Sequence, residues 1–196
     1  MDTSTIPSTL HERVVCSISA AAKYNIPTNL LLAVAQKEAG RPGQWVRNRN
    51  GTSDVGTMQF NTAYLATLDR YHITAADVAS AGCYPYDLAA WRLRQHILHD
   101  VGDLWTRASN YHSRTPRYNA PYRLDLMAKA NWWADWLHHQ FITTAQAPRP
   151  PPRPASLVSA SGDDNRHSDS SVVLARGTMQ SSNRYVPRII TATVQP

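Results

Sequence analysis

One carboxylic acid ends a segment that is otherwise apolar. The segment runs from Leu30 to Gly40, and Leu31, Val34 and Glu38 follow one another at spacings of three and four residues, so Glu38 continues an apolar helix face. Burial and the negative end of the helix dipole both disfavour the carboxylate, and we expect a raised pKa. A carboxylic acid that stays protonated near neutral pH can protonate a glycosidic oxygen. Glu38 is the candidate catalytic acid, although a glutamate at a helix end can also point to water or pair with an arginine.

A loop rich in Asn, Gly and Ser follows this helix over residues 41–57 and leads into Gly56-Thr57-Met58-Gln59. Asp54 in this loop is the nearest second carboxylate in the sequence. Ordinary glycosidases use two carboxylates, so an Asp54 that faced a sugar groove would make hydrolysis possible. Its position in a tight Asn/Gly turn favours a turn-capping role instead.

A third motif, Ala108 to Pro116, contains Tyr111 and His112 and is followed by Asn119 and Tyr122. The order of these segments closely resembles the lytic transglycosylases of the lysozyme superfamily. Within them, the chain is most similar to the subgroup attached to conjugation, type IV and type III secretion machines. The resemblance covers about residues 12–125.

The resemblance implies a role for each matching residue. Glu38 would be the single catalytic acid and base, and Met58 and Gln59 would line the sugar groove. Tyr111 would support Glu38, and His112 stands where many relatives have Asn. Asn119 completes the expected substrate-binding set. The chain departs from the family pattern in having Ala39 after the glutamate where a serine is usual, and Thr57 and Phe60 in place of Leu and Ile.

The implied reaction cleaves peptidoglycan without consuming water. Glu38 would protonate the oxygen between N-acetylmuramic acid and N-acetylglucosamine, and its carboxylate would then deprotonate the C6 hydroxyl that closes a 1,6-anhydro ring. Two alternatives remain. One is a lysozyme-like hydrolase on the same fold, and the other is a weakly catalytic glycan-binding component of a secretion or conjugation apparatus.

The two cysteines, Cys16 and Cys83, favour one disulfide in an exported protein and two free thiols in a cytosolic one. They fall where the secretion-linked relatives carry paired cysteines, so the resemblance favours a disulfide and an oxidising compartment. No Cys/His spacing suggests zinc, and we expect no metal and no cofactor. His96 and His99, near Asp100 and Asp103, are expected to form a solvated helix face rather than a metal site.

The fold is expected to be all-α and lysozyme-like, of the goose type, with one long motif-bearing loop. Helical periodicity predicts helices over Thr9–Tyr24, Thr28–Ala39, Asn61–Leu68, Thr74–Ala81, Pro85–Val101, Leu104–Tyr111 and Pro121–Phe141. No convincing strand alternation is found before residue 170. Residues 1–144 are expected to form the catalytic domain. Residues 145–196 are expected to be a disordered tail, first rich in Pro and Arg and then in Ser, Asp and Asn.

The bulk composition limits the partners. The chain of 196 residues has a net charge of +6, which suits an acidic polymer such as nucleic acid, anionic lipid or bacterial wall. Its basic residues are not interleaved with aromatics as in a nucleic-acid groove, and we expect no nucleic-acid partner. Charge alone does not choose among the remaining polymers, and it is the resemblance that implies peptidoglycan. No apolar run is long enough to span a membrane. Residues 1–10 do not have the pattern of a signal peptide, yet the resemblance implies a periplasmic location and partners in a secretion or conjugation machine.

Overall fold

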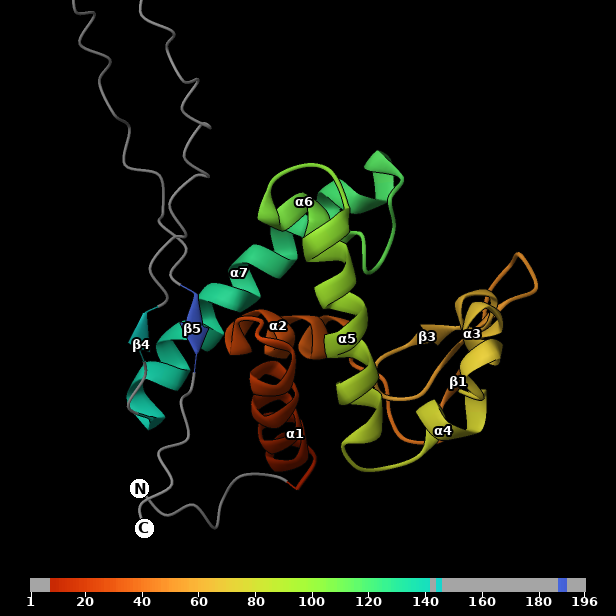
Figure 1. Cartoon of the computed structure of the whole chain (residues 1–196), viewed down its shortest axis with the longest axis horizontal. Coiled ribbons are helices and arrows are strands. Elements are labelled where there is room, and N and C mark those ends of the chain that lie inside the picture. The colour runs from red at the N-terminus through yellow and green to blue at the C-terminus, as the bar shows by residue number, and fades with distance from the viewer. Residues whose placement is uncertain (1–7, 142–143, 146–186, 190–196) are drawn as a thin grey trace, which may run out of the picture. The chain divides into compact units, whose positions relative to one another are not determined.

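The computed structural model describes residues 8–141, 144–145 and 187–189. It is mostly helical, as the sequence predicts, and carries a small three-stranded sheet and a two-stranded one (Figure 1). The helices are α1 Ser8–Tyr24, α2 Thr28–Glu38, α3 Thr62–Leu68, α4 Ala75–Ala79, α5 Tyr84–His99, α6 Leu104–Ser109 and α7 Pro116–Gln140, with a 3-10 turn, η2, at Asp69–Tyr71.

The motif-bearing loop is more regular than expected. It contains the antiparallel strands β1 Trp45–Arg47, β2 Ser53–Val55 and β3 Phe60–Asn61, in the order β1-β2-β3. The prediction of a loop without strands was therefore wrong. Strands of two or three residues are too short to show the alternation on which a strand prediction rests.

The last long helix begins earlier than predicted. It starts at Pro116 rather than Pro121, which lies inside α7. Either proline suits a first helical turn, because proline lacks the N–H that is unpaired there. Within α7, Pro121 removes only one early backbone hydrogen bond, so the helix continues through it.

Helix α2 forms the centre of the core. Its residues from Thr28 to Ala35 are buried, and it packs against α1, α5 and α7 (Figure 1). Polar contacts also fix it to α7. Asn29 Nδ2 donates to the Ala130 carbonyl at 3.1 Å, and Trp133 Nε1 donates to Gln36 Oε1 at 2.9 Å. A helix that is apolar almost all round is held in this way from several sides.

Covalent and polar contacts join α1 to α5. Cys16 in α1 forms a disulfide with Cys83, the residue that precedes α5. At the C-terminal end of α1, Lys23 and the Tyr24 hydroxyl donate to the Asp87 carboxylate at 2.8 and 2.9 Å. The start of α5 is thereby fixed to the middle and to the C-terminal end of α1.

Part of the predicted tail is ordered as a strand. β4 Thr144–Ala145 pairs antiparallel with β5 Arg188–Ile189, and the Arg188 N–H donates to Asn29 Oδ1 at 3.1 Å. The rest of the predicted tail lies outside the described residues. None of the helices that the structure describes combines the length and hydropathy needed to cross a membrane.

Candidate active site

Glu38 is the last residue of α2, and its carboxyl group faces α7. Ala39 adopts a left-handed conformation with φ of 48° and ends the helix, its N–H bonding to the Ala35 carbonyl. The Tyr122 hydroxyl of α7 donates to Glu38 Oε1 at 2.7 Å. Glu38 and Tyr122 are 84 positions apart in the sequence, and their helices pack against each other in the core.

The environment of Glu38 favours its neutral form. Burial raises the pKa of the Glu38 carboxyl from 4.5 to about 7, and the Asp54 charge adds to this. The hydrogen bond from Tyr122 and the charges of Arg92 and Lys37 oppose the rise in pKa without cancelling it. A carboxyl with this pKa populates both protonation states near neutral pH, as a group that first donates and then accepts a proton requires.

Glu38 opens into a cavity between the end of α2 and the start of α7. The cavity has a volume of about 320 Å³ and is lined by Lys37, Glu38, His112, Tyr118, Pro121 and Tyr122. The His112 ring stacks on the Tyr122 ring, with centroids 4.8 Å apart and planes 2° apart. Lys37 Nζ lies 5.7 Å from the Tyr122 ring centroid and pairs with Asp125 at 2.7 Å. The cavity thus combines one acid, aromatic faces and a cation.

Close backbone packing brings the Met-Gln segment to the end of α2. The Gly40 N–H donates to the Thr57 carbonyl at 3.2 Å, and a Cβ at Gly40 would lie 2.1 Å from the Gly56 carbonyl oxygen. It would also lie 2.6 Å from Nε2 of Gln59, which donates to the Gly56 carbonyl at 2.8 Å. Only glycine fits at position 40, and its absence of a side chain sets Gln59 beside the Glu38 helix.

Gly56 packs closely against α4. Its backbone is buried there, and an added Cβ would lie 2.0 Å from the Val78 carbonyl oxygen. Its φ of +70° also excludes most other residues.

Asp54 holds the three strands together. Its carboxylate accepts from Asn48 Nδ2 at 3.0 Å and from Asn61 Nδ2 at 2.8 Å. The three residues belong to the turn after β1, to β2 and to β3. This is the kind of local role that its Asn/Gly-rich surroundings favoured, although its charge also reaches Glu38 and raises the pKa of that carboxyl.

Met58 and Tyr111 lie in the core. Met58 is 0% exposed and Tyr111 is 2% exposed, and the Tyr111 hydroxyl donates to the Met58 carbonyl at 3.0 Å. Burial raises the pKa of Tyr111. The hydroxyl that donates to Glu38 belongs to Tyr122 rather than to Tyr111, to which the resemblance assigns the support of Glu38.

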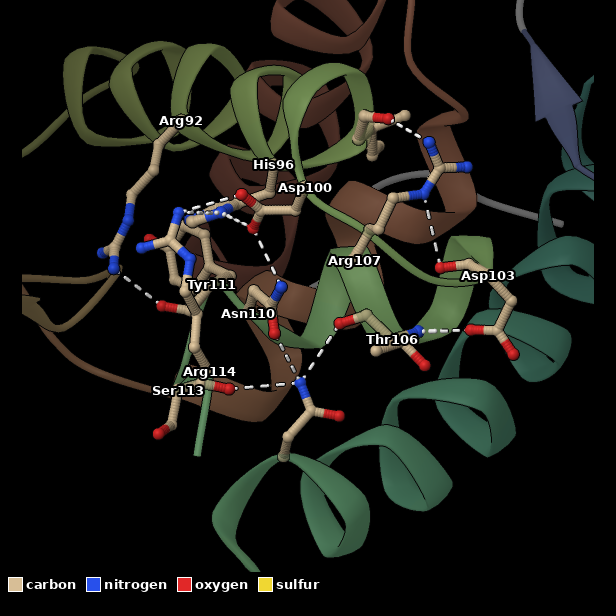
Figure 2. Close-up of polar contacts among 12 residues, drawn as sticks. Arg92, His96, Asp100, Asp103, Thr106, Arg107, Asn110, Tyr111, Ser113 and Arg114 are labelled. Carbon is tan, nitrogen blue, oxygen red and sulfur yellow. Dashed lines mark hydrogen bonds and ion pairs between the residues drawn. The ribbon is translucent and has the colours of Figure 1, made fainter. Parts of the chain in front are cut away.

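Asn119 is also buried and acts within the protein. Its Nδ2 group donates to the Thr106 carbonyl at 3.1 Å, to Asn110 Oδ1 at 2.8 Å and to the Ser113 carbonyl at 3.1 Å. The accepting groups are drawn in Figure 2. These bonds fix the connection between α6 and α7, which carries His112.

A second polar cluster braces the same connection. Asp100 accepts from His96 at 2.7 Å, from Asn110 at 2.8 Å and from Arg114 at 2.9 Å (Figure 2). Although burial raises the pKa of Asp100, the three donors outweigh burial and lower that pKa to about 2. His96 is buried, contrary to the expectation of a solvated face, and burial lowers its pKa. Among the described residues, no group of three or more potential ligands is arranged to hold a metal ion.

Comparisons with known proteins show similarity to proteins of Shigella and Salmonella. The chain is 32% identical over 104 residues to Protein IpgF of Shigella flexneri, which covers 53% of this chain and 68% of that protein. It is 28% identical over 121 residues to Invasion protein IagB of Salmonella typhimurium, which covers 60% of this chain and 72% of that protein. No protein-family model matches the chain.

Proposed function

The chain belongs to the family of Protein IpgF, and we propose that it is a peptidoglycan lytic transglycosylase. The observation that carries the proposal is the Glu38 carboxyl, whose burial raises its pKa to about 7 at the edge of an open cavity. Among the described residues that line this cavity, Glu38 is the one carboxylic acid. A single acid poised near neutral pH suits a reaction in which one group both donates and removes a proton.

The reaction proceeds in two proton transfers. The neutral Glu38 carboxyl donates its proton to the oxygen that joins C1 of N-acetylmuramic acid to C4 of N-acetylglucosamine, and the C1–O bond breaks. The resulting carboxylate removes the proton from the C6 hydroxyl of the same muramic acid. The C6 oxygen then bonds to C1 and closes the 1,6-anhydro ring, and the proton taken from the C6 hydroxyl leaves Glu38 neutral again.

The other site residues divide into two groups. His112 and Gln59 contact the sugar, since both are partly exposed and flank the end of α2. Tyr122 positions the Glu38 carboxyl through its hydrogen bond, whereas the buried Met58, Tyr111 and Asn119 hold the surrounding backbone.

The proposed setting is the periplasm, where the enzyme opens the wall locally for a secretion or conjugation apparatus. The disulfide between Cys16 and Cys83 suits an oxidising compartment. A similar protein is named an invasion protein, which fits an activity tied to such an apparatus.

The test is digestion of purified peptidoglycan by the wild type and by Glu38→Gln, followed by mass spectrometry. Glutamine keeps the shape and the hydrogen-bonding capacity of glutamate but has no transferable proton. Because general acid–base catalysis contributes about 10²–10⁴-fold, and one group here serves both steps, we expect a loss at the upper end of this range. The wild type should release products with 1,6-anhydromuramic ends.

Two results would contradict the proposal in different ways. Reducing ends from the wild type would identify a lysozyme-like hydrolase, and Asp54 would then be the first residue to replace. Equal activity of Glu38→Gln and the wild type would remove Glu38 from the mechanism.

A further inference from the structure

An aromatic cavity lies along the N-terminal half of α5, away from His112. It has a volume of about 410 Å³ and is lined by Tyr24, Tyr71, Ile73, Tyr84, Asp87, Leu88 and Trp91. Tyr71 and Tyr84 are 53% and 41% exposed, so their rings are available to a ligand. None of these residues takes part in the proposed proton transfers at Glu38.

A third cavity has lining residues in common with both the aromatic cavity and the catalytic cavity. This middle cavity has a volume of about 420 Å³, shares Trp91 with the aromatic cavity and shares His112 with the catalytic cavity. Its walls also include Tyr64, Arg92, Gln95 and Arg114. The shared residues place the three cavities in one series.

One side of α5 runs along the aromatic cavity and the middle cavity. Each α5 residue that lines them has another three or four positions away: Tyr84, Asp87, Leu88, Trp91, Arg92, Gln95, His96 and His99. Such spacings place side chains on one side of a helix. From Tyr84 to His99 the helix rises about 22 Å, and Figure 2 shows Arg92, His96 and Asp100 in succession near its end. The track is long enough for a linear polymer.

The chemistry of the aromatic cavity suits a sugar. Tyrosine and tryptophan rings present flat apolar faces with polar edges, which match the C–H faces and hydroxyl edges of a pyranose. Asp87 adds an acceptor: its two oxygens accept from Lys23 and Tyr24, and a carboxylate offers about four lone-pair positions in all. A mostly apolar pocket with a few fixed polar groups is the usual form of a small-ligand site.

We propose that the aromatic cavity is a distal sugar-binding subsite for the same glycan strand that Glu38 cleaves. This inference rests on the proposed function, because it takes the substrate of the catalytic cavity to be a glycan. The strand passes from His112 through the middle cavity to Tyr71 and Tyr84. Long strands therefore bind better than short ones, and cleavage depends on chain length.

The test compares the double variant Tyr71→Ala/Tyr84→Ala with the wild type on two substrates. One is a glycan strand of about ten disaccharides, and the other is a strand of two. Loss of two stacking contacts should raise KM about tenfold for the long strand and leave KM for the short strand unchanged. The control is Trp132→Ala on α7, which removes a 53% exposed aromatic that lines none of the three cavities.

Binding to the Glu38→Gln protein separates this inference from the proposed reaction. If the wild type yields no anhydro product, the proposed reaction is wrong, and the subsite is tested by binding alone, through the ratio of the Kd for the short strand to the Kd for the long strand. A ratio that falls toward one when Tyr71→Ala/Tyr84→Ala is added to Glu38→Gln supports the subsite. A double variant that changes both strands equally, or neither, overturns it, as does a wild type that binds long and short strands alike.

Discussion

The Glu38 carboxyl can stay protonated near neutral pH because it is buried, and this burial lowers the free energy of unfolding when the group is ionised. The pKa of Glu38 is about 7 in the folded protein and near 4.5 in the unfolded chain, so the folded state binds more protons between these values. The free energy of unfolding therefore falls as pH rises from 4.5 to 7.

From this linkage we expect Glu38→Gln to be more stable than the wild type at pH 8, by about 1–3 kcal/mol. At pH 4 the two proteins should unfold alike, because glutamate is then neutral in the folded protein and largely neutral in the unfolded chain. Urea unfolding at both pH values measures the difference. Equal stability of the two proteins at pH 8 would contradict the conclusion that burial of the Glu38 carboxylate lowers the free energy of unfolding.

Tyr122 tunes the same carboxyl through one hydrogen bond. Its hydroxyl stabilises the Glu38 carboxylate, so Tyr122→Phe should raise the Glu38 pKa above its present value. Since the first step needs the neutral acid, kcat/KM falls as pH rises through that pKa. We expect this alkaline limb to move up by about one pH unit in the variant.

The matched control for this experiment is Tyr118→Phe. Tyr118 lines the same cavity, but it is not among the groups that shift the Glu38 pKa. Its alkaline limb should stay where the wild type has it. An unshifted limb in Tyr122→Phe would show that the hydrogen bond does not set the pKa.

Asn119 adds side-chain hydrogen bonds to the connection between α6 and α7. Asn119→Ala would leave Thr106, Asn110 and Ser113 acceptors without this donor in a buried place. We expect the free energy of unfolding to fall by about 1–3 kcal/mol. Thermal or urea unfolding measures this loss, with the exposed Asn50→Ala as control. A variant of unchanged stability and raised KM would instead assign Asn119 to sugar binding.

The predictions from sequence succeeded where a signal was local and repeated. Helices α2 and α5 have long apolar periodicity, and their positions were predicted to within a few residues. The strands β1 to β3 carry too few residues to show a period, and the start of α7 depended on a choice between Pro116 and Pro121. The contact between Glu38 and Tyr122 was missed because it joins residues 84 apart, and no spacing rule reports such a contact.

Strand β5, near the C-terminal end of the chain, contacts α2 through Arg188 and therefore bears on which residues the catalytic domain requires. We propose that residues 1–144 form the catalytic domain, and a truncation after Thr144 should keep most cleavage activity because every site residue lies upstream. It also removes the Arg188 N–H that binds Asn29, so we expect a loss of about 1 kcal/mol in unfolding free energy. Activity on isolated sacculi and urea unfolding test the two parts. A folded but inactive truncation would make the C-terminal segment part of the enzyme.

Helix α2 joins the acid to the hydrophobic core so directly that the two cannot vary independently. Its buried residues contact α1, α5 and α7, and Glu38 is its last residue. A change in packing on any of these helices shifts the carboxyl relative to Tyr122, because close-packed interiors transmit small displacements. In evolutionary terms, selection for catalysis acts on the core as well as on the cavity. Exposed surface positions can diversify with little effect on Glu38, whereas the interior of α2 is inherited together with the candidate site.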